Sequence, residues 1–545
     1  MIFTDKRGRY FVFLSVILLV AAGWKALLLV KDVIPFNSDE AIVALMARHI
    51  LAGERPVFFY GQVYMGSLDA FLVAIGFSIF GQKVWVIRLI QILLYSGTII
   101  STAAIANVGF GTRKIGLMAA VLLAIPTVNV TLYTTASLGG YGEALLIGNQ
   151  ILLLGLLIRR DILAQNYSIK LWVEVGVLGF LAGLGIWANG LTLVYSGPVC
   201  VWIFVLLGRN REHLGVKRVG YIVLLAAVGT LIGAAPWWLY GIRVGGPALL
   251  QELMGDAVAV EQEPWPVQVA HHAVNYLLLG MTALFGFRPP WNVKWLGLPL
   301  LPFVLLFWVW ILWWFFRQLK EKKAGNSVRW LLTGVAGVLT VGFLLTSFGV
   351  DPSGRYFVPL SVLLALAAGD VIAQKISPPR LQAALLGLVV VFHALGTWQC
   401  ALEYPPGITT QFDAVTAINH RYDEELIRFL REQGETRGYS NYWVSYPVAF
   451  LSDEVLIFVP RLPYHQDMRY TPRDDRYAPY NALVESSPRV AYITTNHPEL
   501  NIYLRKAFEE LQVTWLEKQI GDYYIFYNLS SPVRASEIGL GAYSP

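Results

Sequence analysis

The stretch that organises this chain runs from Val33 to Leu51 and reads VIPFNSDEAIVALMARHIL. It follows the first long apolar segment and places two adjacent carboxylates, Asp39 and Glu40, just past a membrane boundary. The side chains after them recur with helical period on one side, namely Ile42, Leu45, Met46, His49 and Ile50. We predict a short amphipathic helix on the membrane surface, with Asn37 or Ser38 as its N-cap and both acids in its first turn.

The composition is that of a polytopic helical membrane protein. Of the 545 residues, 56% are hydrophobic and only 14% are charged, whereas soluble domains carry about 25% charged residues. A helical span needs about 20 apolar residues, and the sequence contains about eleven such segments. They lie near residues 10–30, 84–106, 115–131, 144–159, 171–188, 191–208, 219–239, 295–316, 328–348, 357–375 and 380–399. The shorter apolar run 67–80 is assigned to the first outer loop, as a re-entrant or surface helix.

Lysine and arginine residues set the expected topology. If the N-terminus is cytoplasmic, the inner segments contain most of the membrane-flanking Lys and Arg, and the short outer turns 132–143 and 349–356 contain only Arg355. This asymmetry follows the positive-inside rule, and it predicts a plasma (inner) membrane protein with a cytoplasmic N-terminus. No basic stretch interleaves with aromatic residues on a soluble face, so no nucleic-acid partner is expected.

The composition of the chain becomes more polar after about residue 400. Segment 420–545 is charged and has no long apolar run. It predicts a helix at 423–431 and short strands at 437–443, 455–459, 490–494 and 523–527. We predict a transmembrane domain at 1–400, whose first outer loop at 31–83 carries surface helices, and a small extracytoplasmic α/β domain at 401–545.

Two acidic positions are candidates for chemistry. Asp39 and Glu40, partly desolvated at a membrane face, could accept a proton from a hydroxyl as a general base or hold a divalent cation such as Mg²⁺ or Mn²⁺. Helix capping is the structural alternative. Glu143 ends a glycine-rich turn at the start of an apolar span, where an acid is costly unless it is used or paired. It is a candidate second acid or metal ligand, or a helix-terminal charge with access to solvent.

The outer turn around Arg355 suggests anion binding. In the sequence Gly354-Arg355-Tyr356 the backbone and the guanidinium can approach an anion together, and guanidinium clamps phosphate through two N–H groups. A salt bridge to Asp351 and a contact with a lipid headgroup are the alternatives. The choice between them depends on what else faces this turn.

Three further polar side chains alternate along the first outer loop. Tyr60, Gln62 and Tyr64 could line a sugar or phosphate pocket, since phenols and amides bind both. An interfacial aromatic belt explains each tyrosine equally well.

Taken together, these motifs resemble those of the GT-C membrane glycosyltransferases, which include the protein O-mannosyltransferases and the aminoarabinose transferases acting on lipid A. The first-loop acid of that family is similar to Asp39, with Glu40 beside it, and its second acid after the third span matches Glu143. Its late Arg-Tyr followed by Pro resembles Arg355-Tyr356-Phe-Val-Pro.

The resemblance is incomplete in detail. The family often has His- or Lys-Pro-Pro in the first loop, where this chain has Gly61-Gln-Val-Tyr-Met-Gly66. The phosphate contact of this loop and any metal requirement are therefore left open. The stretch Gly438-Tyr-Ser-Asn-Tyr-Trp-Val-Ser-Tyr446 looks like tail domains on bacterial members of uncharacterised specificity.

The resemblance implies an enzyme that takes a sugar from a polyprenyl-phosphate carrier and transfers it to a hydroxyl or phosphate at the outer membrane face. Asp39 would be the base or a metal-linked carboxylate, and Arg355 with Tyr356 would bind the carrier phosphate. The expected partners are this lipid-linked donor and membrane lipids, and the acceptor is open. Two other classes stay in view: a lipid-linked-sugar flippase or transporter, which needs polar groups near mid-membrane, and a non-catalytic scaffold.

Overall fold

The computed structural model describes residues 6–253, 263–321 and 325–541. Contacts between residues divide the chain into two compact units. The first unit contains residues 1–31, 63–69 and 88–399, and the second contains 32–62, 70–87 and 400–545. Most of the first outer loop therefore packs in the same unit as the C-terminal segment.

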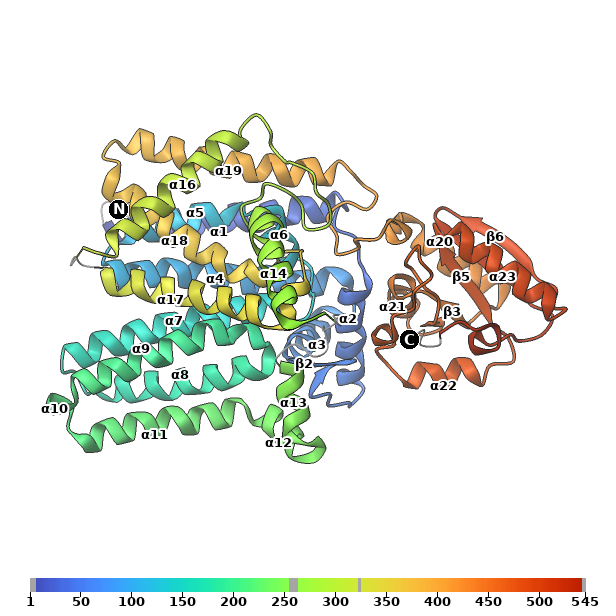
Figure 1. The fold of residues 1–545 in the computed structure, drawn as a ribbon, viewed down its shortest axis with the longest axis horizontal. Coiled ribbons are helices and arrows are strands. Elements are labelled where there is room, and N and C mark those ends of the chain that lie inside the picture. The colour runs from blue at the N-terminus through green and yellow to red at the C-terminus, as the bar shows by residue number, and fades with distance from the viewer. Residues whose placement is uncertain (1–5, 254–262, 322–324, 542–545) are drawn as a thin grey trace. The chain divides into compact units, whose positions relative to one another are not determined.

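The first unit is a bundle of long helices (Figure 1). Ten helices in the described part of the chain are long and apolar enough to cross a membrane, which confirms the predicted polytopic helical fold of an integral membrane protein. These helices are α1 (Lys6–Val30), α4 (Val84–Phe110), α7 (Tyr141–Leu163), α8 (Ile169–Ala188), α9 (Leu193–Arg209), α11 (Val216–Gly233), α16 (Leu301–Gln318), α17 (Asn326–Leu345), α18 (Val358–Lys375) and α19 (Pro379–Ala401).

The third of the eleven predicted spans, 115–131, is wrong as a single helix. α5 (Arg113–Ala124) ends before Pro126, and α6 (Val128–Tyr133) begins after it. Proline lacks a backbone N–H and clashes with the carbonyl four residues earlier, so it interrupts a helix interior. α5 nevertheless packs against α1 and α18 inside the bundle.

Shorter helices complete the described part of this region. The apolar run 67–80 forms α3 (Leu68–Phe80), which at 13 residues is too short for a span, as expected. Between α11 and α16 the chain forms α12 (Ala235–Val244), α13 (Gly246–Leu253), α14 (Trp265–Val274), a π-helical turn (Asn275–Gly280) and α15 (Met281–Leu284).

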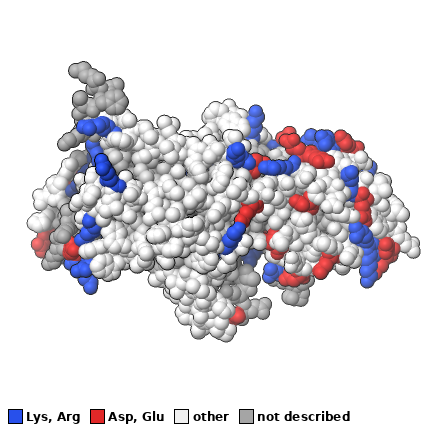
Figure 2. All heavy atoms as spheres, turned by 90° about the horizontal axis from the view of Figure 1, so that it is seen from above, with Lys and Arg blue, Asp and Glu red and all other residues white. Residues whose placement is uncertain are grey.

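Charged side chains are unevenly distributed over the bundle. Figure 2 shows a nearly uncharged middle on the visible face, with Lys and Arg gathered at the end where α1 begins in Figure 1. Several helices carry a basic residue at one terminus, including Arg113 at the start of α5, Arg209 at the end of α9 and Arg317 at the end of α16. Which membrane face this end occupies stays a prediction of the positive-inside rule.

Small residues allow α8 and α11 to pack closely, and this pair makes the most extensive helix contact of the bundle. A Cβ atom at Gly183 would clash with the carbonyl oxygen of Thr230, and one at Gly229 would lie 2.6 Å from the carbonyl oxygen of Gly176. Glycines spaced four apart permit such backbone approach between membrane helices.

The second unit contains a five-stranded sheet in the order β4-β3-β5-β7-β6. β3 pairs in parallel with β4 and β5, whereas β7 is antiparallel to β5 and β6. The strands are β3 (Arg437–Ser440), β4 (Ile457–Pro460), β5 (Ala491–Thr495), β6 (Leu516–Ile520) and β7 (Tyr523–Tyr527). The accompanying helices are α20 (Asp423–Gln433), α21 (Tyr442–Leu451), α22 (Pro479–Glu485) and α23 (Pro498–Glu510).

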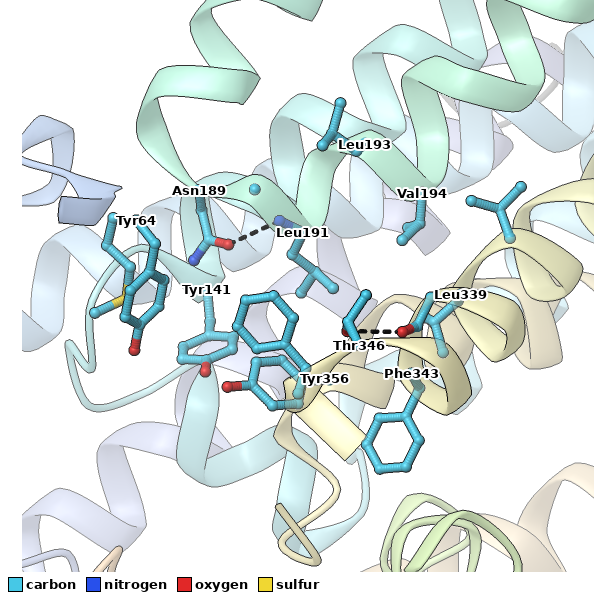
Figure 3. Close-up of a pocket in the computed structure, with 15 residues that line it drawn as sticks. Tyr64, Tyr141, Asn189, Leu191, Leu193, Val194, Leu339, Phe343, Thr346 and Tyr356 are labelled. Atoms are coloured by element: carbon cyan, nitrogen blue, oxygen red, sulfur yellow. Dashed lines mark hydrogen bonds between the residues drawn. The ribbon is translucent and has the colours of Figure 1, made fainter. Parts of the chain in front are cut away.

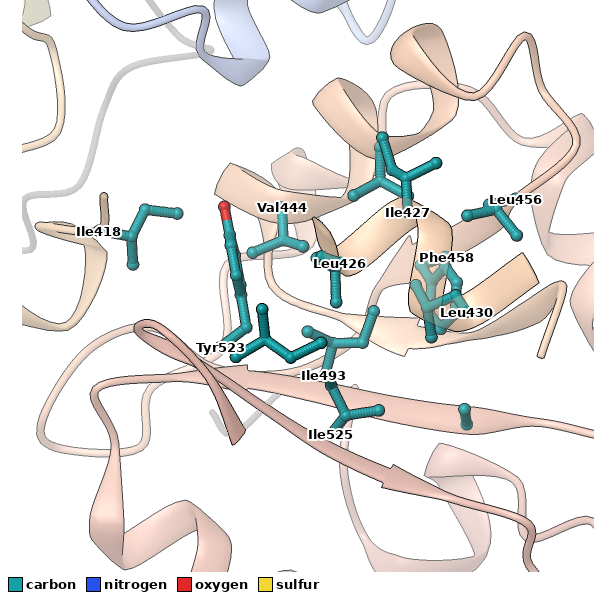
Figure 4. Packing of buried hydrophobic residues seen from close by; sticks show 13 residues of the cluster. Ile418, Leu426, Ile427, Leu430, Val444, Leu456, Phe458, Ile493, Tyr523 and Ile525 are labelled. Carbon is teal, nitrogen blue, oxygen red and sulfur yellow. The ribbon is translucent and has the colours of Figure 1, made fainter. Parts of the chain in front are cut away.

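An apolar core holds α20 and α21 against this sheet. Leu426 and Leu430 of α20 and Val444 of α21 lie over Phe458 and Ile493 of the strands (Figure 4). The predicted helix at 423–431 is confirmed, and Gly434 ends it in the left-handed region.

Two expectations for this α/β region need correction. The strand predicted at 437–443 ends at Ser440, because the Asn441 side chain accepts the Trp443 N–H at 3.0 Å and starts α21. The strand β6 was not predicted, since its sequence LEKQI is polar and mostly exposed, as befits the edge of a sheet.

The helix predicted after the first span is α2 (Ser38–Leu51). Asn37 caps it as expected, accepting the Glu40 N–H at 3.2 Å. The amphipathic pattern predicts one buried face, but nearly every side chain of α2 is buried, because α21 also packs against it.

The close packing of α8 and α11 can be tested with two glycine-to-alanine substitutions in α11, one at the contact and one away from it. Gly229→Ala should lower the melting temperature of the detergent-solubilised protein, because its Cβ meets the α8 backbone. Gly220→Ala in the same helix meets no atom within 4 Å and should leave the melting temperature unchanged or raise it, since alanine favours helix by about 1 kcal/mol over glycine. Equal stabilisation by both variants would contradict the packing described here.

Candidate functional site

The first unit contains a cavity of about 280 Å³ among α7, α9 and α17 and the turns that adjoin them. Leu193, Val194 and Leu339 give it an apolar wall, and Tyr64, Tyr141, Asn189 and Tyr356 supply the polar side chains (Figure 3). The tyrosine hydroxyls lie on one side of the cavity and the aliphatic side chains on the other. Such a space suits an apolar chain that ends in a polar group.

Arg355 lies next to the polar side of this cavity. Its Nη2 donates to the Tyr356 hydroxyl at 3.0 Å, and its Nε pairs with Asp351 at 2.6 Å. The salt bridge to Asp351 considered from the sequence is therefore present. The Arg355 side chain remains 30% exposed, and Nη1 has no partner among the described residues. A guanidinium held in this way can still receive an anion.

The turn that carries Arg355 is held from two sides. Arg288 donates to the Pro352 carbonyl at 2.6 Å, and Asn129 donates to the Gly354 carbonyl at 3.0 Å. Arg288 also lies within electrostatic range of Asp351. Two guanidinium groups and one carboxylate leave one net positive charge at this turn, which favours phosphate over a neutral ligand.

Glu143 meets a partner that the sequence did not suggest. It begins α7, is 2% exposed, and its carboxyl group is hydrogen-bonded to that of Asp69 at the start of α3. Asp69 also accepts from Gln91 at 3.1 Å, from the Ser137 hydroxyl, and from the Gly140 N–H. Burial raises the pKa of Asp69, and these donors lower it.

Two buried carboxyl groups in contact cannot both be ionised, so one proton lies between them. Asp69 accepts from Gln91, the Ser137 hydroxyl and the Gly140 N–H, whereas the donors near Glu143 among the described residues are the Gln91 amide and its own backbone N–H. The proton therefore belongs to Glu143, which donates to Asp69. The role of Glu143 as a second acid or metal ligand stays a prediction. Its pairing with Asp69 also satisfies a buried carboxylate.

The described residues do not supply a metal-ligand set. No group of three or more His, Cys, Asp or Glu side chains gathers within the described ranges. The oxygens of Asp69 accept from N–H and O–H groups, which a cation would have to displace. This donor set does not fit a divalent cation.

Asp39 lies in the second unit, in the first turn of α2, and is partly exposed. Its Oδ1 accepts from the Tyr442 hydroxyl at 2.6 Å, and its Oδ2 accepts from the Thr410 hydroxyl at 3.2 Å. Glu40 beside it is fully buried. Of the two first-loop acids, Asp39 is thus the one whose carboxylate can meet a substrate.

Gln62 pairs with Arg476, a residue of the C-terminal segment. In the amide orientation that satisfies hydrogen bonding, its oxygen accepts from both terminal nitrogens of Arg476 at 2.8 Å. The Arg476 guanidinium lies 5.6 Å from the centre of the Tyr442 ring, whose hydroxyl binds Asp39. Gln62 is therefore linked to Asp39 through two C-terminal side chains.

Tyr60 belongs to a different network of the second unit. Its hydroxyl donates to Glu54 at 2.8 Å and lies 2.9 Å from His49, and its ring stacks on Tyr477. His49 also contacts Glu454 at 3.0 Å. Burial raises the pKa of Glu454, but the hydrogen bond from His49 helps to outweigh burial and the pKa falls to about 2. A substrate contact for Tyr60 stays a prediction.

Asp474 is a second acid within electrostatic range of Asp39. It is 7% exposed, and burial raises its pKa to about 7 against the opposing effects of Arg476 and of a hydrogen bond from Tyr464. Asp39 raises this pKa further, and Arg473 lowers it. The surroundings of Asp39 thus contain a carboxyl group that titrates near neutrality.

Comparison with solved structures identifies the fold of this chain. No family model and no curated protein matches the sequence. The structure is similar to ArnT from Cupriavidus metallidurans bound to undecaprenyl phosphate, with a TM-score of 0.58, 13% identity, and coverage of 96% of this chain and 99% of that chain. The chain has the GT-C fold. The GT-C-like architecture predicted from the sequence is confirmed.

A second GT-C structure agrees more loosely. The archaeal oligosaccharyltransferase AglB from Archaeoglobus fulgidus, in complex with an inhibitory peptide and a dolichol-phosphate, matches with a TM-score of 0.50, 13% identity, and coverage of 89% of this chain and 69% of that chain. Its complex with Zn and sulfate matches with a TM-score of 0.50 and 12% identity, covering 94% and 73%.

Several residues of these sites were missed from the sequence. Asp69 could have been found, since it is an acid at the mouth of an apolar helix and the argument applied to Glu143 applies equally to it. Tyr442 and Thr410 had no such signal. The Tyr442 hydroxyl nevertheless binds Asp39, a contact that no short sequence pattern indicates.

The proton on Glu143 can be located by substitution. Glu143→Gln should keep the melting temperature of the purified protein, because its amide N–H₂ replaces the carboxyl proton as donor to Asp69. Glu143→Ala should lower it, since Asp69 loses that donor in a buried site. Asp69→Asn should also lower it, because an amide N–H₂ would face other donors. Tolerance of Asp69→Asn together with loss of stability in Glu143→Gln would place the proton on Asp69 instead.

Asp474 predicts a pH-dependent stability. Its pKa in the folded protein is raised, so its contribution to stability is fully present below about pH 4 and is lost as pH rises through about 7. A rise in pKa from 3.8 to about 7 corresponds to a cost on the order of 4 kcal/mol above pH 7. Asp474→Asn should therefore melt at a higher temperature than wild type at pH 8, by a margin that shrinks at pH 5. A margin independent of pH would show that Asp474 does not titrate in this range.

Proposed function

We propose that this protein is a glycosyltransferase that moves a sugar from a polyprenyl-phosphate carrier to a hydroxyl acceptor at the outer face of the membrane. The observation that carries the proposal is the cavity of the first unit, which has an aliphatic wall, tyrosine hydroxyls on its other side and Arg355 next to them. Undecaprenyl phosphate, the lipid bound to ArnT, has the matching chemistry of an apolar chain with an anionic end.

In this proposal the isoprenoid chain lies along the aliphatic wall and the phosphate binds Arg355. The guanidinium offers Nη1 to the phosphate while Asp351 and Tyr356 hold Nε and Nη2. As the bond between the anomeric carbon and the phosphate oxygen breaks, negative charge develops on the phosphate. A fixed cation at that position stabilises the transition state more than the ground state.

Asp39 is the proposed base. The acceptor hydroxyl attacks the anomeric carbon, a new carbon–oxygen bond forms, the bond to the carrier phosphate breaks, and the hydroxyl proton passes to the Asp39 carboxylate. Direct displacement of this kind inverts the configuration of the sugar. Asp39 suits the task better than Glu40, because it is partly exposed whereas Glu40 is fully buried.

Binding and transfer can be tested separately in the full-length protein in nanodiscs. Arg355→Ala should weaken the binding of undecaprenyl phosphate about 10- to 100-fold, the loss expected for a charged hydrogen-bonded contact. Asp39→Asn should bind the lipid normally but abolish the release of undecaprenyl phosphate from undecaprenyl-phosphate-linked sugars in membranes that supply the acceptor.

The matched control is Arg211→Ala, which removes an exposed arginine elsewhere in the first unit and should leave both readouts at the wild-type level. Wild-type turnover by Asp39→Asn would remove the proposed base. Wild-type lipid affinity in Arg355→Ala would remove the proposed phosphate site.

A further inference from the structure

The Asp39 carboxylate is held by residues that lie about 370 to 400 positions later in the chain. Tyr442 donates to its Oδ1 at 2.6 Å, and Thr410 donates to its Oδ2 at 3.2 Å. Each oxygen therefore has one donor from the C-terminal segment. Two donors on different oxygens fix the rotation of a carboxylate as well as its position.

Tyr442 is itself held firmly. It is 3% exposed at the start of α21, and its backbone carbonyl accepts a hydrogen bond from the Ser38 hydroxyl, one residue before Asp39. The Arg476 guanidinium lies over its ring at 5.6 Å. Burial and the neighbouring Asp39 carboxylate raise the pKa of Tyr442 well above its ordinary value, so the phenol stays a donor throughout the neutral range.

Thr410 is also held in place by a hydrogen bond. Its hydroxyl accepts from the Asn37 side chain at 2.8 Å, so its own proton is directed at Asp39. Asn37 is also the N-cap of α2. The cap of the helix and the orientation of the carboxylate are thus set by one hydrogen-bonded chain, from Asn37 through Thr410 to Asp39.

We propose that Tyr442 and Thr410 are positioning residues for the Asp39 base, so that the C-terminal segment is an integral part of the catalytic site. This inference rests on the proposed function. A base accelerates transfer only when its lone pair meets the acceptor proton within hydrogen-bond reach, and a misplacement of about 1 Å can lower the rate about 100-fold. The tyrosine hydroxyl leaves further lone pairs of the carboxylate available for that proton.

The test compares tyrosine variants of the full-length protein by the release of undecaprenyl phosphate from undecaprenyl-phosphate-linked sugars. Tyr442→Phe should lower kcat at least about 10-fold and change the KM for the donor less than about twofold. Thr410→Val should act in the same direction, and Thr410→Ser should restore wild-type behaviour.

Tyr492→Phe is the matched control, because among the described residues the hydroxyl of this buried tyrosine of the same unit donates to the Val533 carbonyl and not to Asp39, Tyr442 or Thr410. It should keep the wild-type kcat and the wild-type KM for the donor. A double variant gives a second readout: in the Asp39→Asn background, Tyr442→Phe should cause no further loss, since Tyr442 acts through Asp39.

The outcomes separate this inference from the proposed function. Wild-type activity in Asp39→Asn would overturn the proposed function. An inactive Asp39→Asn together with a wild-type kcat in Tyr442→Phe and Thr410→Val would overturn only the positioning role. If Tyr442→Phe fails to fold, the Thr410→Val and Thr410→Ser pair decides the matter.

Discussion

A charge beside lipid is stable only when it is paired or hydrogen-bonded, and this constraint accounts for the polar contacts of the helical bundle. Arg329 and Asp370 form a two-point ion pair of 2.7 and 3.1 Å, and both side chains are almost fully buried. The carboxyl groups of Glu143 and Asp69 satisfy the same constraint by sharing a proton. Arg355 differs, because it is paired with Asp351 and still 30% exposed. That combination is what a binding site for an anionic lipid needs.

The second unit applies the same constraint to Asp39. A carboxylate in the first turn of α2 is favoured by the helix dipole, but here Tyr442 and Thr410 also hold it. Because α21 packs against α2, the C-terminal segment is built into the surroundings of the first-loop acid. This arrangement argues against a tail that serves only to recruit partners, since its side chains reach the residue proposed to do the chemistry.

Much of the fold could be predicted from the sequence, because it depends on local pattern. Apolar length predicted the spans, Asn37 predicted the start of α2, and the amphipathic pattern of 423–431 predicted α20. The break at Pro126 was missed because the apolar run continues across it. The partners of Glu143 and Asp39 were missed for another reason: Asp69 and Tyr442 lie 74 and 403 positions away, and no short pattern records contacts of that range.

The central claim is that the Arg355 guanidinium binds the phosphate of a polyprenyl-linked donor whose chain lies in the cavity of the first unit. A cryogenic electron microscopy map of the full-length protein in nanodiscs with undecaprenyl phosphate tests it most directly. We expect phosphate density on Arg355 and isoprenoid density along the aliphatic wall of the cavity. Phosphate density away from Arg355, or isoprenoid density outside this cavity, would contradict the claim.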